Sequence, residues 1–113
     1  MSLSVPYHFT TAASTNLQPI GSADQGGSIK GLVICVGTVS TPTAYIKFYW
    51  TNTQPTVGTT VPGVTIAATA NLTQSFPDGI TGNGQLWVAV TGAQTDADST
   101  NATAGIQVSV LVE

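Results

Sequence analysis

The sequence predicts a single all-β domain, a β-sandwich with jelly-roll-like strand order or, alternatively, an immunoglobulin-like sandwich. Three observations lead to this prediction. The 113 residues include 12 glycines and 6 prolines but only 6% charged side chains, against about 25% in an average domain. Short alternating or β-branched runs, about seven or eight in number, are separated by turn residues. No stretch shows helical periodicity, so the chain is expected to be built from strands and turns.

The stretch around which the fold is predicted to form is Thr43–Asn52, which clusters aromatic residues in strict alternation. Successive strand side chains point to opposite faces. The two faces therefore carry Ile46, Phe48 and Trp50 on one side, and Tyr45, Lys47 and Tyr49 on the other. We expect the apolar face to form the middle of the core and the second face to be half wet or covered by another protein.

The N-terminal third is predicted to be mostly irregular. Ser4–Ala13 is expected to form a short first strand or an extended arm, so that residues 1–15 are an arm or edge strand and residues 16–113 the sandwich domain. Ser14–Ser28 is polar and glycine-rich, as loops are, with one extended piece expected around Leu17–Ile20.

Ile29–Val39 is a nearly continuous apolar run that is too short and too interrupted by glycine for a helix. It is predicted to be a buried strand, with Gly31 or Gly37 marking a bulge or close packing. The connector Ser40–Pro42 is short, which favours a hairpin between this strand and the aromatic one.

The middle of the chain alternates short strands with turn signals. Residues 53–63 form a polar loop, and Val64–Thr69 and Asn71–Phe76 are predicted strands. Phe76–Ile80 contains Pro-Asp-Gly, a strong turn signal. Asn83-Gly84 is the pair favoured in type I′ hairpins.

The C-terminal part is predicted to contain two more strands around one loop. Gln85–Thr91 is apolar on both faces, which places it in the interior of a sheet. Gly92–Gly105 has no hydrophobic periodicity and is expected to be an exposed loop. Ile106–Val112 closes the chain with one apolar face.

The charge balance argues against several partners. The net charge is −3, with two basic and five acidic residues, so no basic patch is available for nucleic acid or for an anionic membrane surface. No run approaches the length of a membrane helix, and the start lacks a signal-peptide pattern, so synthesis in the cytoplasm is expected. So few charges indicate that much of the outer surface is buried against neighbours.

The residues needed for catalysis are nearly absent, and we expect no enzyme, no cofactor and no metal. His8 is the single histidine, and Cys35 lies in an apolar run that would suppress its thiolate. Asp96 and Asp98 alternate in one loop, but two carboxylates are too few for a dedicated calcium site. A solvated polar loop is the better interpretation.

Aromatic side chains leave a carbohydrate-binding module as an alternative. Tyr45, Tyr49 and Trp87 could form a sugar platform if their rings were coplanar and exposed. Trp50 shares its face with core residues and is expected to be buried. Trp87 is expected to be exposed or to pack against a neighbouring subunit.

Three segments resemble a group of small virion proteins of tailed bacteriophages. Their shared pattern is Y-x-K-x-Y, a loop with P-x-V-G and a second proline, F-x-x-G-I, and L-x-V-A-V-T-G followed by D-x-D-x-T. In this sequence the matching residues are Tyr45, Lys47, Tyr49, Pro55, Val57, Gly58, Pro62, Phe76, Gly79, Ile80, Leu86–Gly92, Asp96, Asp98 and Thr100. The similarity covers roughly the last two thirds of the chain.

The resemblance implies a non-enzymatic β-sandwich protein of the capsid decoration or cement type. Such a protein would be assembled in the host cytoplasm, lie on the capsid exterior of the virion and stabilise the head. Its partners would be the major capsid protein and copies of itself, with a trimer preferred because capsids offer three-fold sites. A head–tail or tail component is a further alternative.

Two regions are expected to make the contacts, the N-terminal arm and the loop Gly92–Gly105. The interface candidates are Tyr7, His8 and Phe9 in the arm, and Tyr45, Lys47, Tyr49 and Trp87 in the strands.

Overall fold

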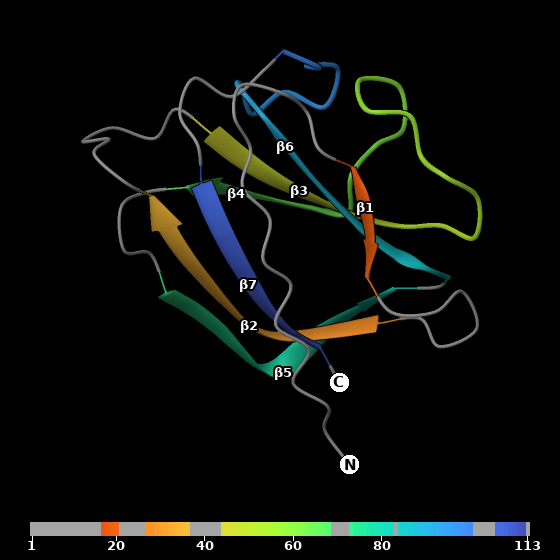
Figure 1. Ribbon diagram of the computed structural model, residues 1–113. Coiled ribbons are helices and arrows are strands. Elements are labelled where there is room, and N and C mark those ends of the chain that lie inside the picture. Colours follow the sequence, from red (N-terminus) through yellow and green to blue (C-terminus); the bar gives the residue numbers. More distant parts are fainter. Residues whose placement is uncertain are drawn as a thin grey trace.

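The computed structural model describes residues 17–20, 27–36, 44–68, 73–82, 84–100 and 106–112. Within these ranges every regular element is a strand, and no helix occurs (Figure 1). The prediction of an all-β chain is therefore confirmed for the described parts. The arm at residues 1–15 and the loop positions 101–105 lie outside them.

The described strands follow the chain from the first extended piece to the C-terminal end. They are β1 (Gln18–Ile20), β2 (Gly27–Val36), β3 (Ala44–Trp50), β4 (Val64–Ala68), β5 (Thr73–Gly82), β6 (Leu86–Thr91) and β7 (Ile106–Val112). The extended piece expected near Leu17–Ile20 is β1, and the aromatic stretch is β3.

The strands form two antiparallel sheets. One has the order β1-β6-β3-β4 and the other the order β5-β2-β7 (Figure 1). The aromatic strand β3 lies between β6 and β4, and β6 lies between β1 and β3, so both predicted interior strands are confirmed.

The apolar face of β3 continues across its neighbours. Ile46 pairs with Val90 and Phe48 with Val88, and all four side chains are 0% exposed. Paired residues of an antiparallel ladder have side chains on the same face, so this register brings the large apolar groups together. Trp50, at the end of β3, is only half-buried.

The predicted hairpin between β2 and β3 is wrong, because the two strands belong to different sheets. β2 has ten residues and pairs along most of its length with β7 on one side and with β5 on the other. With a strand on each side, β2 has both of its edges paired within its own sheet and has no edge left for β3.

The turn predicted at Phe76–Ile80 is also wrong as a chain reversal, since these residues lie inside β5. Ile80 pairs with Ile29 and Ser75 with Gly31, so four residues of β5 stand against the single Lys30 of β2. Proline and glycine here interrupt the ladder without reversing the chain. The register of β2 shifts between Ile29 and Gly31, which confirms the bulge predicted at Gly31; the other candidate for it, Gly37, lies outside the described residues.

The Asn-Gly signal does not produce a hairpin, because β5 and β6 lie in different sheets. Asn83 is outside the described residues. Gly84 has φ +100°, in the left-handed region that glycine adopts without strain. A Cβ at Gly84 would lie 3.1 Å from the backbone nitrogen of Asn52, so the turn also needs a residue without a side chain.

Trp50 lies against two glycines from other parts of the chain. A Cβ added at Gly63 would lie 2.7 Å from Cζ3 of Trp50, and one added at Gly82 would lie 2.7 Å from its Cβ. Gly82 is the last residue of β5, whereas Trp50 is the last residue of β3. The indole thus contacts a strand of the other sheet at a place where only glycine fits.

Candidate functional site

The second face of β3 is where the sequence placed most of its candidate contact residues. Lys47 pairs with Ala89 of β6 and with Thr65 of β4, and Tyr49 pairs with Trp87. These side chains therefore share one face of the four-stranded sheet. Next along the chain from β6 comes the segment of residues 92–100, which we call the covering segment.

Lys47 is 0% exposed, and its ammonium group is held by the covering segment. Nζ donates hydrogen bonds to the carbonyl oxygens of Thr95, at 2.7 Å, and Asp98, at 3.1 Å. A buried charge is tolerated only when it is hydrogen-bonded. The lysine consequently ties the covering segment to the middle of the sheet.

The side chain of Asp98 shapes the covering segment from within. One carboxylate oxygen, Oδ2, accepts hydrogen bonds from the backbone nitrogens of Ala93, at 3.0 Å, and Thr100, at 3.3 Å. The hydroxyl of Thr100 donates to Oδ1 at 2.8 Å. The backbone nitrogen of Gly92 also donates to the carbonyl of Thr100 at 3.0 Å, which closes the base of the segment.

Burial and charge shift three pKa values in this region. Desolvation lowers the pKa of Lys47, although the charges of Asp98 and Asp96 oppose that change. Desolvation raises the pKa of Tyr49, and the charge of Asp96 raises it further. For Asp98, desolvation acts upward, but hydrogen bonds from Thr100 and Ala93 and the charge of Lys47 outweigh it and lower the pKa.

The lowered pKa of Asp98 predicts a specific loss of stability in acid. A carboxylate whose folded pKa lies below its ordinary value of 3.8 stabilises the fold above that value, and the contribution disappears as pH falls through the folded pKa. Asp98→Asn should therefore lower the free energy of unfolding by about 1 kcal/mol near neutral pH. The difference from wild type should shrink as pH falls below 3.8 and vanish once Asp98 is protonated in the folded state.

Urea unfolding at several pH values measures this effect. Thr100→Val is the matched variant, because it removes one donor to the same carboxylate and should give an intermediate result. A constant difference between Asp98→Asn and wild type from neutral to acidic pH would contradict the assignment.

The other candidate contact residues differ in accessibility. Tyr49 is 1% exposed, whereas Tyr45 and Trp87 are half-buried. The indole nitrogen of Trp87 donates to the carbonyl of Thr51 at 3.0 Å. Tyr7, His8 and Phe9 lie outside the described residues.

The expectation that this face is half wet or covered by another protein is wrong at Lys47, where the chain's own covering segment lies. Tyr49 is likewise buried within the chain, so Tyr45, Tyr49 and Trp87 do not form one exposed aromatic platform. The phenol oxygen of Tyr49 has no hydrogen-bond partner in the described parts of the chain.

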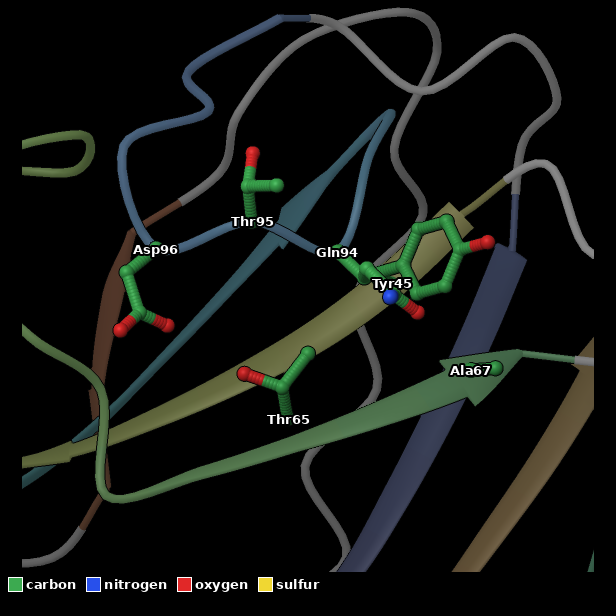
Figure 2. A pocket seen from close by; sticks show the side chains of 6 residues that line it. All are labelled: Tyr45, Thr65, Ala67, Gln94, Thr95 and Asp96. Carbon is green, nitrogen blue, oxygen red and sulfur yellow. The ribbon is translucent and has the colours of Figure 1, made fainter.

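A hollow opens beside this face, between β3, β4 and the covering segment (Figure 2). Its volume is about 580 Å³, and it is lined by Tyr45, Thr65, Ala67, Gln94, Thr95 and Asp96. Tyr45 pairs with Ala67, and Thr65 stands beside Lys47 in the ladder, so the register sets the floor of the hollow. The covering segment forms its wall.

The sequence alone did not reveal that Lys47 reaches the covering segment. The partners are 48 and 51 residues away, and the acceptors are backbone carbonyls, which leave no mark in the sequence. One signal was present, a lysine in the centre of an apolar strand. The spacing of Asp98 and Thr100 was a second signal, since Asp and Thr side chains bond nearby backbone groups in loops.

The described residues contain neither a metal-binding cluster nor a membrane-spanning helix. Within the described ranges, no three His, Cys, Asp or Glu side chains gather closely enough to hold a metal ion. The same parts of the chain contain no helix long and apolar enough to cross a membrane.

Comparison of the chain with protein-family models, with curated proteins and with solved structures found no match.

Proposed function

We propose that the chain is a non-enzymatic virion structural protein of a tailed bacteriophage, of the capsid decoration or cement type. The observation that carries this proposal is the meeting of two motifs of the resemblance. Lys47, from Y-x-K-x-Y, donates to the carbonyl of Asp98, from D-x-D-x-T. Lys47 thus ties the aromatic strand to the segment that carries D-x-D-x-T, which is a structural and not a catalytic use of both motifs.

The small number of charged side chains, and the positions of Lys47 and Asp98 among them, support the same proposal. Lys47, one of only two basic residues, is buried in a structural role. The carboxylate of Asp98 accepts a hydrogen bond from the backbone of its own segment, at Ala93. Few charged side chains remain on the surface to repel neighbouring molecules. A surface with little charge suits a protein that packs in a lattice.

We further propose that the two sheets form the layers of a β-sandwich with jelly-roll-like strand order. The burial of Ile46, Phe48, Val88 and Val90 on the apolar face of β3 and β6 supports this, because such a face needs a second layer. The contact of Trp50 with Gly82, between strands of different sheets, supports it as well.

In this role the domain binds the assembled head and stabilises it, since a ligand of only the assembled state shifts the equilibrium towards that state. The major capsid protein and other copies of the chain are the proposed partners on the capsid exterior. A trimer is the preferred oligomer, because a closed ring matches a three-fold site.

The test is co-sedimentation with undecorated heads of the phage that encodes the chain, after light scattering has given the mass in solution. Binding that saturates at a fixed ratio per head is expected. A stable monomer that leaves the heads bare would overturn the proposal.

Deletion of residues 2–15 tests the predicted arm contact. The shortened chain should keep its far-ultraviolet circular dichroism, because residues 16–113 are predicted to form the domain. It should lose its binding to heads, because the arm is predicted to contact the capsid. Wild-type-like decoration by the shortened chain would show that the arm makes no necessary contact. The control is Val61→Ala, which trims an exposed side chain in the 53–63 loop.

A further inference from the structure

The hollow between β3, β4 and the covering segment is an open depression, since five of its six lining residues are exposed. Its volume of about 580 Å³ falls within the range of about 300–1,000 Å³ that such sites show. Figure 2 shows the carboxylate of Asp96 on one side of the hollow and the ring of Tyr45 on the other, with Thr65 between them on the floor.

The lining determines which ligand chemistry fits. Its residues offer one aromatic ring, one amide, one carboxylate and three hydroxyl groups. No cation faces the hollow from the residues that line it, since Lys47 beneath the covering segment is 0% exposed and bonded to carbonyls. An anionic ligand would be repelled by Asp96 without compensation. A purely apolar ligand would leave the polar lining desolvated.

A neutral sugar satisfies both conditions. Its hydroxyl groups donate to a carboxylate and bond an amide, and its C–H face packs on an aromatic ring. The neighbours needed for this are Asp96, Gln94 and Tyr45, and all three line the same hollow.

The wall of the hollow is fixed before any ligand arrives. The carbonyl of Thr95 accepts from Lys47, and the backbone nitrogen of Asp98 donates to that same carbonyl at 3.0 Å. These bonds hold the backbone on both sides of Asp96. A pre-formed wall reduces the ordering cost of binding.

We propose that this hollow binds a pyranose unit of a neutral saccharide, stacked on Tyr45 and hydrogen-bonded by Asp96 and Gln94. This site differs from the platform of Tyr45, Tyr49 and Trp87 considered from the sequence, because it needs only one ring. The proposal goes beyond the virion role and does not depend on it.

The test is a titration of the full-length, ¹⁵N-labelled chain followed by nuclear magnetic resonance. The probes are maltose, cellobiose, lactose, N,N′-diacetylchitobiose and methyl α-mannoside, with glucuronate as the anionic comparator. At least one neutral probe should shift the amide signals of Tyr45, Thr65 and Gln94–Asp96 in a saturable manner, and glucuronate should not.

Three variants connect any binding to the named groups. Tyr45→Ala should weaken it about tenfold, the scale of one aromatic contact, while Tyr45→Phe keeps the ring and should change affinity less than about twofold. Asp96→Asn should weaken it about tenfold, because a charged acceptor is lost. Asp96 is exposed, so this variant is expected to fold even if Tyr45→Ala does not.

Several outcomes would overturn the proposal. They are the absence of saturable shifts with every neutral probe, shifts that lie away from the hollow, and stronger binding of glucuronate than of the neutral sugars. Equal affinity of Asp96→Asn and wild type would also overturn it.

Discussion

Lys47→Ala should lower the free energy of unfolding by about 3–5 kcal/mol. The change removes a fully buried side chain and leaves a cavity in the sheet face. It also removes the Lys47 donor to two part-buried carbonyls: that of Thr95 keeps its bond from the backbone nitrogen of Asp98, whereas that of Asp98 loses its bond from Lys47. Urea unfolding followed by circular dichroism measures the loss.

Lys47→Met separates the two causes, because methionine retains most of the aliphatic stem and lacks the ammonium group. We expect a loss of about 1–3 kcal/mol, the cost of the missing hydrogen bonds. Amide hydrogen exchange should increase in the covering segment and stay unchanged in β6. Wild-type stability of Lys47→Met, with unchanged exchange, would show that the ammonium group does not hold this segment.

Gly82→Ala should cost about 1–3 kcal/mol through overpacking against Trp50. The new Cβ would lie 2.7 Å from Cβ and from Cδ2 of Trp50, and closer still to its Cγ. These atoms are at the root of the side chain, so rotation of the ring relieves little of the clash. Backbone movement between β5 and β3 is required, and thermal unfolding should record a lower midpoint.

Gly63→Ala is the matched variant, because its Cβ would meet Cζ3 and Cε3 at the far edge of the same ring. That edge has more freedom to move, so the loss should be smaller than for Gly82→Ala. In the background of Trp50→Gly, which removes Cβ as well as the ring, Gly82→Ala should become nearly neutral, giving a coupling energy of about 1–3 kcal/mol. Additive losses would contradict the contact.

The strands were predictable where a local pattern carried the information. Strict alternation marked β3, the largely apolar run at Gln85–Thr91 marked β6, and a glycine in a β-branched run marked the bulge of β2. Each of these patterns involves only residues that lie close together in the sequence, so it can be recognised without knowledge of the fold.

The pairing of strands was less predictable. A short connector at Ser40–Pro42 and the Asn83-Gly84 pair both favoured hairpins, yet the strands beside each belong to different sheets. Turn residues report the local backbone geometry, whereas the partner of a strand is decided by distant segments. Pro77 and Gly79 are also turn residues that did not predict the pairing, because both lie inside β5, which continues on either side of them.

The candidate site was predictable only in part. Tyr45 was identified as a half-accessible aromatic, and it does line the hollow. The roles of Lys47 and of the covering segment depended on contacts to backbone carbonyls far along the chain. Because every residue has such a carbonyl, composition and spacing cannot show which one is used.

The reach of Lys47 across 48 and 51 residues has a consequence for the order of folding events. The ammonium group gives up its water only after β3, β4 and β6 have assembled and the covering segment has closed over them. Contacts of such large sequence separation come late, after the entropy of closing the intervening chain has been lost. We therefore expect Lys47 to act mainly on the barrier to unfolding, so that it slows unfolding of the domain more than it speeds folding.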